Sequence, residues 1–177
     1  WQRIKIGNLI PSFLTAWFIT RSVPTVRTNI YGKFEAMTDS KIYLDTAPFI
    51  YYLEMNALYF DRTRTFFKNC YENHTPLVTS AVTVEEYCIH PLSFGDEKSA
   101  EDFQAFISGM NIDVVPCDRL IALEVARIRA KYKAIKALDA IHLATAIFSE
   151  CQVFVTNDKQ LRQIHEINVV TMDSWPW

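Results

Sequence analysis

Acidic side chains recur in this sequence where an apolar, strand-like run gives way to a helical pattern. Asp45 directly follows the apolar residues 42–44, and junctions of the same kind hold Glu86, Asp139 and Asp158. In an open parallel sheet, functional groups collect at the carboxyl ends of the strands, so acids far apart in sequence can meet in one cleft. Carboxylate oxygens are the ligands that hard divalent cations prefer. The placement therefore predicts a metal site of the kind that metal-dependent nucleases use.

Each acid also has a purely structural interpretation. Asp45 could cap the helix that follows it, because Asp is a preferred helix N-cap. Glu86 stands three residues after Thr83, which is the spacing of a capping box. Asp139 could complement a helix dipole, and Asp158 could cap a helix or form a turn. Taken together, these interpretations must explain why acids, rather than Ser, Thr or Asn, occupy all of these junctions.

The elements that position the acids alternate between strands and helices. Apolar runs predict strands at residues 42–44, 77–79, 112–115, 153–156 and 167–171. Helical periodicity predicts helices at residues 46–56, 61–73, 101–110, 118–133 and 138–149, another from residue 83, and a short one at 159–164. Such alternation is typical of an α/β fold with a parallel sheet.

Length and composition favour one domain, preceded by a segment without the strand-helix alternation. The chain has 177 residues, 50% of them hydrophobic, which is enough for one good core. Residues 1–36 begin with Trp1 and lack the strand-helix alternation, and their apolar run around residues 10–19 is too short to span a bilayer. We expect Met37 to be the functional start, residues 37–177 to form the domain, and residues 1–36 to be a non-native or disordered extension. A native accessory arm is the alternative.

Cysteine spacing and net charge bear on the kinds of site and ligand that the chain can have. The cysteines are widely separated, which argues against a zinc site or a disulfide framework and favours a reducing, cytoplasmic setting. Residues 1–36 hold five of the 18 Lys and Arg and one of the 20 Asp and Glu. The rest of the chain therefore carries 13 basic and 19 acidic groups, a net charge of −6. Such an acidic body binds nucleic acid poorly unless a metal ion offsets some of the acids.

The segments around the acids resemble a known family. Residues 42–46 (IYLDT), 79–86 (TSAVTVEE), 136–146 (KALDAIHLATA) and 155–158 (VTND) together resemble the PIN domain, in particular VapC-like toxins. The resemblance spans about residues 41–172 and depends on all of these motifs occurring in the family's order. It implies an acidic quartet that binds Mg²⁺ or Mn²⁺, here Asp45, Glu86, Asp139 and Asp158. Small polar residues that support the acids match at Thr46, Ser80 and Thr156. Glu85 is the alternative to Glu86, although the spacing from Thr83 favours Glu86.

The resemblance also implies a fold and an activity. The fold is a three-layer α/β/α sandwich with a central, mostly parallel sheet. The activity is divalent-metal-dependent endoribonuclease cleavage of RNA by the toxin of a type II toxin–antitoxin pair. The same likeness implies a homodimer and a cognate antitoxin. We expect no membrane association, and the cysteines favour the cytoplasmic location. The alternatives are an RNA-processing nuclease outside such a pair and a non-catalytic PIN scaffold that binds RNA or protein. A haloacid-dehalogenase-type phosphatase is disfavoured, because it needs a second Asp where this chain has Ala47.

Other residues have weaker functional interpretations. Arg127, Arg129, Lys131 and Lys133 lie on one predicted helix, and we expect them to contact RNA phosphates, with a solvated surface as the alternative. His142 follows Asp139 by three residues, and we expect a packed or hydrogen-bonded histidine, contact with a metal-bound water being the alternative. The aromatic residues between 49 and 60 predict core packing, with a surplus available for a protein interface.

Overall fold

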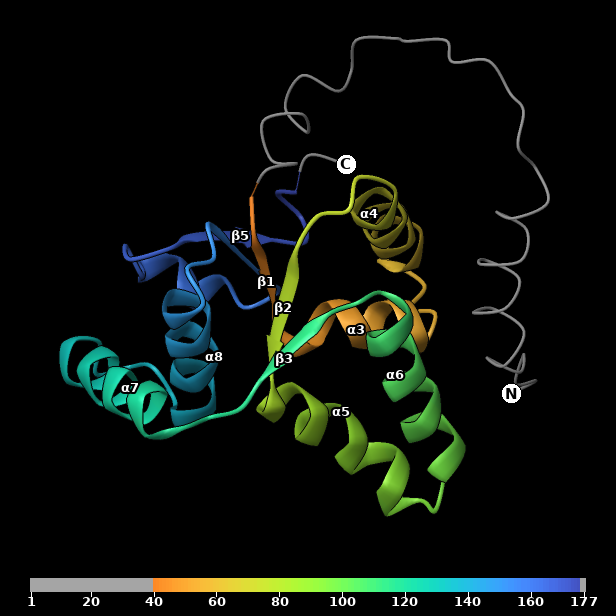
Figure 1. Cartoon of the computed structure of the whole chain (residues 1–177), viewed down its shortest axis with the longest axis horizontal. Helices are drawn as coiled ribbons and strands as arrows, with labels where there is room; N and C mark the ends of the chain where they lie inside the picture. The colour runs from red at the N-terminus through yellow and green to blue at the C-terminus, as the bar shows by residue number, and fades with distance from the viewer. Residues whose placement is uncertain (1–39, 176–177) are drawn as a thin grey trace, which may run out of the picture.

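A computed structural model describes residues 40–175, and five strands form one sheet within them (Figure 1). The strands are β1 (Ile42–Leu44), β2 (Leu77–Ser80), β3 (Asp113–Val115), β4 (Val153–Thr156) and β5 (Asn168–Thr171). Their order is β3-β2-β1-β4-β5, and every neighbouring pair is parallel. The predicted α/β fold is confirmed, and the sheet, expected to be mostly parallel, is parallel throughout the described region.

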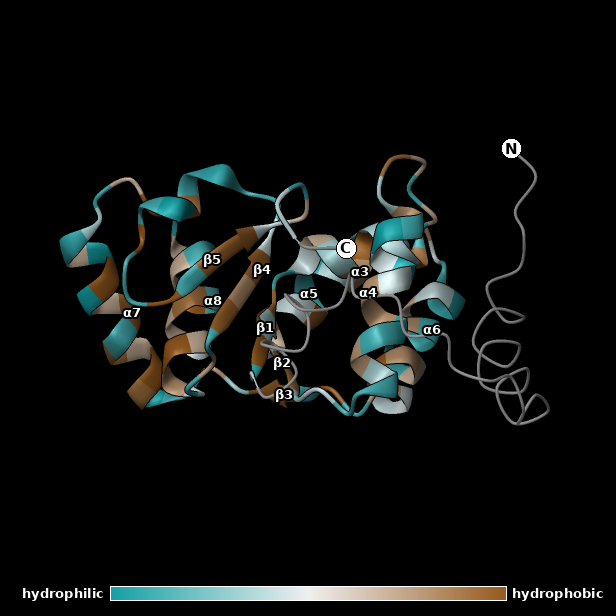
Figure 2. Ribbon diagram, turned by 90° about the horizontal axis from the view of Figure 1, so that it is seen from above, coloured by the Kyte–Doolittle hydropathy of each residue, from teal (hydrophilic) through white to brown (hydrophobic). Residues whose placement is uncertain are grey.

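Helices cover both faces of the sheet, which gives the three layers that the resemblance implied (Figures 1 and 2). One core cluster joins the sheet to α3 (Thr46–Leu53), α4 (Phe60–Glu72), α5 (Ala81–Ser93) and α6 (Glu97–Gly109). The other joins it to α7 (Arg119–Lys131), α8 (Ala137–Phe148) and the 3₁₀ helix η2 (Lys159–Gln163). Figure 2 shows apolar residues concentrated in the strands and on α8.

Alternation along the central strand divides its side chains between the two cores. Ile42 and Leu44 pack into the core beneath α3 and α4, whereas Tyr43 packs into the core beneath α8. Successive side chains of a strand point to opposite faces, so a strand covered on both sides must be apolar throughout. Tyr43 stacks on Phe154 of β4, with ring centroids 5.0 Å apart.

The predicted elements are present, and local capping accounts for the ends that differ. The helix expected from residue 101 begins at Glu97, because Asp96 caps it by accepting hydrogen bonds from the amide of Ser99 (3.3 Å) and its hydroxyl (2.8 Å). The helix expected to reach residue 56 ends at Leu53, and Met55 adopts a left-handed conformation with φ of 53°. The short helix after residue 158 is a 3₁₀ helix.

The expectations for residues 1–36 and for Met37 as the functional start lie outside the described residues. Within residues 40–175, no helix is both long enough and apolar enough to cross a membrane.

Phe49 is a stringent probe of the core beneath α3. Its ring is fully buried and lies 5.5 Å from that of Phe103 and 5.9 Å from that of Phe67, measured between centroids. Phe49→Ala should lower the free energy of unfolding by about 3–5 kcal/mol, because it removes buried contacts and leaves a cavity. Urea denaturation measures this change. Phe94→Ala is the control: Phe94 is 78% exposed, and its removal should cost less than about 0.5 kcal/mol. Equal losses in the two variants would contradict this account of the core.

Candidate metal centre at the carboxyl edge of the sheet

The predicted acids come from elements that converge at one edge of the sheet. Asp45 directly follows β1 and is the N-cap of α3, and Asp158 follows β4 and is the N-cap of η2. Because β1 pairs with β4, Leu44 lies opposite Val155, and the two strands end side by side. Asp139 lies in the first turn of α8, and Glu86 lies on α5, the helix that follows β2.

Hydrogen bonds from neighbouring threonines hold the Asp45 carboxylate. The amide of Thr46 donates to Asp45 Oδ1 at 2.8 Å, and the Thr156 hydroxyl donates to Oδ2 at 2.6 Å. Thr156 Oγ1 also accepts a hydrogen bond from the amide of Asp158 at 3.0 Å. Thr156 therefore links the Asp45 side chain to the backbone of the segment that carries Asp158.

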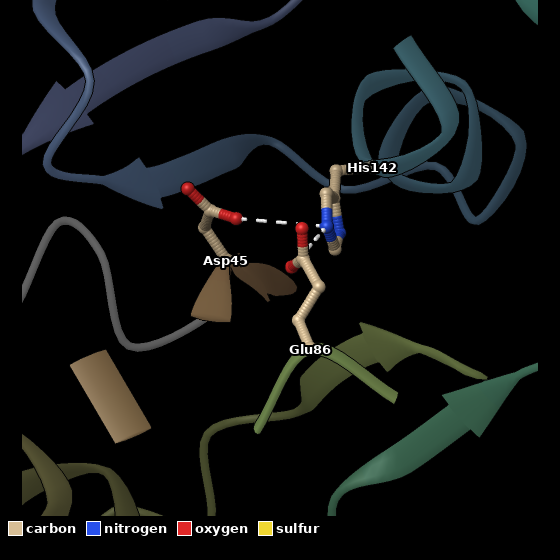
Figure 3. A group of neighbouring side chains, drawn as sticks. All are labelled: Asp45, Glu86 and His142. Atoms are coloured by element: carbon tan, nitrogen blue, oxygen red, sulfur yellow. Dashed lines mark hydrogen bonds and ion pairs between the residues drawn. The ribbon is translucent and has the colours of Figure 1, made fainter. Parts of the chain in front are cut away.

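Glu86 joins Asp45 through shared partners. Its Oε2 accepts a hydrogen bond from the Thr46 hydroxyl and another from His142 Nε2, the latter at 2.9 Å (Figure 3). Burial disfavours the charged form of Glu86, but the hydrogen bonds from His142 and Thr46 outweigh burial and hold its pKa below the ordinary range. Glu85 is exposed. Of the two adjacent glutamates, the structure thus brings Glu86 to Asp45.

His142 is buried behind the carboxylates. Its Nε2 lies 3.8 Å from Asp45 Oδ1, and its Nδ1 lies 2.8 Å from the Tyr43 hydroxyl and 3.3 Å from the Ser80 hydroxyl. Burial opposes the charged imidazolium, yet the hydrogen bond to Glu86 and the negative charges of Asp45 and Glu86 outweigh it and raise the pKa of His142. The expectation of a hydrogen-bonded histidine agrees with this geometry.

Asp139 and Asp158 add negative charge beside Asp45. Burial raises the pKa of Asp139, and repulsion from Asp45 and then Asp158 raises it further. Asp158 Oδ1 accepts a hydrogen bond from the amide of Gln160 at 2.8 Å and caps η2. The carboxylates are therefore crowded, and the pKa of Asp139 records the resulting repulsion.

The structural interpretations of the acids hold in part. Asp45 and Asp158 cap helices, and Asp139 lies in the first turn of a helix. These acids therefore stabilise their own helices and also lie at the carboxyl edge of the sheet. The capping-box interpretation of Glu86 is wrong. Ser80 caps α5 by accepting a hydrogen bond from the amide of Thr83 at 3.3 Å, and the Glu86 carboxylate is engaged by Thr46 and His142 instead.

Three of these side chains form a group compact enough to hold a cation. One ligand atom from each of Asp45, Glu86 and His142 lies within 4.8 Å of the others. Asp45 and Glu86 are metal ligands predicted from the sequence, whereas His142 was expected to be a packed or hydrogen-bonded residue. The one sequence signal that places His142 near the site is its spacing of three residues from Asp139, because residues three apart are neighbours on a helix surface.

The basic residues of α7 and the segment after it differ in their surroundings. Arg127 is paired with Glu124 at 2.8 Å, and Lys131 is paired with Glu166 at 2.6 Å. In the part of the chain that the structure describes, Arg129 and Lys133 form no ion pair and are exposed. Their expected contact with RNA stays a prediction, and Arg129 and Lys133 are its best candidates.

The aromatic residues between 49 and 60 divide between the core and the site. Phe49 and Tyr52 are buried in the core beneath α3. Tyr51 and Tyr59 are only partly buried and stack on each other with centroids 4.5 Å apart. The Tyr51 hydroxyl accepts a hydrogen bond from Asn157 Nδ2 at 2.6 Å, so this pair abuts the segment that carries Asp158.

Comparison with known proteins agrees with this architecture. Residues 42–167 match the family model of the PIN domain. The fold is similar to the structure of VapBC2 from Rickettsia felis bound to a promoter DNA fragment, with a TM-score of 0.63, 15% identity, and coverage of 74% of this chain and 98% of that one. It is also similar to DNA-bound VapBC from Salmonella typhimurium, with a TM-score of 0.62, 22% identity, and coverage of 75% and 98%.

FitAcB from Neisseria gonorrhoeae gives a TM-score of 0.59 at 20% identity, covering 76% of this chain and 99% of that one. At such identities the likeness establishes the fold alone. Among curated proteins, none matches the sequence.

The crowding of carboxylates predicts a pH-dependent stability for the metal-free protein. Because the pKa of Asp139 is raised on folding, its contribution to stability is full below its unfolded pKa and is lost as the pH rises through the folded pKa. Asp158→Asn keeps an N-cap residue but removes one repelling charge. The variant should have a lower Asp139 pKa by carboxyl NMR. Near pH 7 and in chelator, it should be more stable to urea than the wild type by less than about 1 kcal/mol.

Asp118→Asn is the matched control, because Asp118 caps α7 through the amides of Leu120 and Ile121 and is exposed. It should leave the pKa of Asp139 unchanged. An unchanged pKa of Asp139 in Asp158→Asn would show that the two acids do not interact.

Proposed function

This chain belongs to the PIN domain family, and from that membership we propose that it is a divalent-metal-dependent endoribonuclease, the toxin of a type II toxin–antitoxin pair. The observation that supports the proposal is the gathering of acids from elements far apart in sequence: Asp45 and Glu86 lie together, and Asp45 and Asp158 act electrostatically on Asp139. Purely structural acids would not need to gather, because helix caps are satisfied locally.

The donor set fits a hard divalent cation. Carboxylate oxygens suit Mg²⁺ and Mn²⁺. Burial raises the pKa of Asp139, and the charges of Asp45 and Asp158 raise it further, a repulsion that a bound cation would relieve. We propose Asp45, Glu86, Asp139 and Asp158 as the groups that hold Mg²⁺, with Mn²⁺ as the alternative. When bound, such an ion stabilises charge on the attacked phosphate and favours ionisation of water as the nucleophile.

The remaining polar side chains orient the acids. Thr46 donates to both carboxylates, through its amide to Asp45 and through its hydroxyl to Glu86. Thr156 fixes the second oxygen of Asp45. Each carboxylate keeps further lone pairs for a cation, because an ionised carboxylate accepts about four hydrogen bonds or ligands. Preorganisation of this kind lowers the cost of assembling the site around the substrate.

The similar structures and an exposed apolar surface at the end of α5 support the partners that we propose. The structures from Rickettsia and Salmonella are of VapBC bound to DNA, and another similar structure is a toxin–antitoxin complex from Klebsiella pneumoniae. Large apolar side chains are exposed at the end of α5, where Ile89 is 58%, Leu92 44% and Phe94 78% exposed. A cognate antitoxin, and a second copy in a homodimer, are the partners we propose for such surfaces. A cytoplasmic location, and residues 37–177 as the PIN domain, belong to the same proposal.

Cleavage of RNA by the purified protein tests the function. A mixed pool of structured RNA should be cut with Mg²⁺ or Mn²⁺ and left intact with chelator. Asp45→Asn and Asp139→Asn should each lower the cleavage rate by about 100-fold or more, because a metal site supplies several kcal/mol of stabilisation to the transition state. Gel electrophoresis of end-labelled RNA measures the rate, and Asp118→Asn should cut at the wild-type rate.

The alternatives give different results. A folded, metal-loaded protein that binds the RNA pool without cutting it would favour the non-catalytic scaffold. Cleavage without growth arrest on expression would favour an RNA-processing nuclease outside a toxin–antitoxin pair. A toxin should arrest growth, and Asp45→Asn should not.

RNA affinity should depend on Arg129 and Lys133. In the Arg129→Ala, Lys133→Ala double variant, the RNA dissociation constant should rise. The slope of log Kd plotted against log salt concentration should fall by about one for each charge removed. Fluorescence anisotropy across a salt series measures both. Arg127→Ala is the control, because Arg127 is already paired with Glu124, and its effect should be smaller. An unchanged slope in the double variant would contradict the assignment.

A further inference from the structure

A buried hydrogen-bonded chain runs from the sheet to the metal centre. Tyr43 is 0% exposed and His142 is 2% exposed. The Tyr43 hydroxyl lies 2.8 Å from His142 Nδ1, and His142 Nε2 lies 2.9 Å from Glu86 Oε2. Tyr43 belongs to β1, His142 to α8 and Glu86 to α5, so this chain connects elements from both faces of the sheet.

The position of the imidazole proton follows from the partners. An ionised carboxylate can only accept a hydrogen bond, so the contact at Glu86 Oε2 requires a proton on His142 Nε2. In the neutral imidazole, Nδ1 is then the acceptor, and the Tyr43 hydroxyl donates to it. A protonated Nε2 has no lone pair to offer a metal ion.

We infer that His142 is a positioning residue for Glu86 and not itself a metal ligand. The Glu86 carboxylate requires the Nε2–H form, and that N–H fixes one oxygen of Glu86. The Tyr43 hydroxyl supports this form by donating to Nδ1, from which the Ser80 hydroxyl lies 3.3 Å. The Thr46 hydroxyl donates to the same oxygen, Oε2. No hydrogen bond reaches Oε1 from any residue between 40 and 175. The buried chain therefore leaves Oε1 as the Glu86 atom available to a cation.

The close grouping of Asp45, Glu86 and His142 is consistent with this role. Nε2 approaches Asp45 Oδ1 only to 3.8 Å, beyond hydrogen-bonding distance, whereas it is within hydrogen-bonding distance of Glu86. Groups that hydrogen-bond to metal ligands orient them, and their removal commonly weakens metal binding by about 10- to 100-fold.

The positioning role of His142 rests on the proposed metal site. Mn²⁺ binding to the purified full chain tests the metal site and the role of His142 separately. Free Mn²⁺ is measured by electron paramagnetic resonance. His142→Gln retains an amide N–H donor of similar reach, and its Mn²⁺ dissociation constant should stay close to that of the wild type. His142→Met has similar volume but no donor, and its dissociation constant should rise by about 10- to 100-fold. His165→Gln, at an exposed histidine, should bind as the wild type does.

Tyr43→Phe tests the other end of the chain. The variant keeps the ring that stacks on Phe154 but loses the hydroxyl that donates to Nδ1 at 2.8 Å, so its Mn²⁺ dissociation constant should rise about tenfold. Tyr132→Phe removes a hydroxyl that donates to Glu166 and should leave Mn²⁺ binding unchanged. Should His142→Met fail to fold, as judged by circular dichroism, Tyr43→Phe carries the test.

Nitrogen-15 NMR of the histidine rings reads the tautomer directly. The chain has four histidines, and the spectrum of His142→Gln identifies the signals of His142. At alkaline pH, where the ring is neutral, we expect the Nε2–H form in the wild type, retained when Mg²⁺ is added, and a mixture of forms in Tyr43→Phe.

Distinct results separate the two claims. If the wild type binds no Mn²⁺, the proposed metal site fails. If it binds Mn²⁺ but His142→Gln binds as weakly as His142→Met, or if Mg²⁺ displaces the Nε2 proton, His142 is a ligand and the inference is overturned. Wild-type affinity in His142→Met, or in Tyr43→Phe, also overturns it.

Discussion

Parallel pairing of β1 with β2 and β4 is the constraint on which the candidate site depends. It places the end of β1 beside the end of β4, so that Asp45 and Asp158 emerge at the same edge. The same pairing buries both faces of β1, which requires every side chain of Ile42–Leu44 to be accommodated in a core. A shift in register would move both the acids and Tyr43 out of place.

The negative charge of the carboxylates at that edge opposes folding and would favour the binding of a cation. Burial, and then repulsion from Asp45 and Asp158, raises the pKa of Asp139. Within residues 40–175, the side chains that hydrogen-bond to Asp45 and Glu86 are those of Thr156, Thr46 and His142, and none is a lysine or arginine. A site neutralised internally by a buried lysine or arginine would be more stable and would have less affinity for a cation. This is the trade-off between stability and function expected where like charges are gathered.

Polar groups buried beneath the acids give the site its geometry. Tyr43 and His142 carry polar atoms that are buried against an apolar core, and such atoms are costly unless hydrogen-bonded. Each satisfies the other, and Glu86 completes the chain. The apolar core and the candidate metal centre are therefore coupled, because the ring of Tyr43 packs in the core while its hydroxyl contacts His142.

The sequence by itself determined the elements and the acids at their ends, because hydrophobic period and helix caps are local properties. It also placed Asp45 and Asp139 at the right helix starts, whereas helix ends differ where local geometry decides them, as at the Asp96 cap of α6 and at left-handed Met55 after α3. Only the tertiary structure decided what those residues touch. The contact between Tyr43 and His142 spans 99 residues, that between His142 and Glu86 spans 56, and the pairing of Lys131 with Glu166 spans 35. No local pattern encodes such contacts, since they arise from the packing of helices on opposite faces of one sheet.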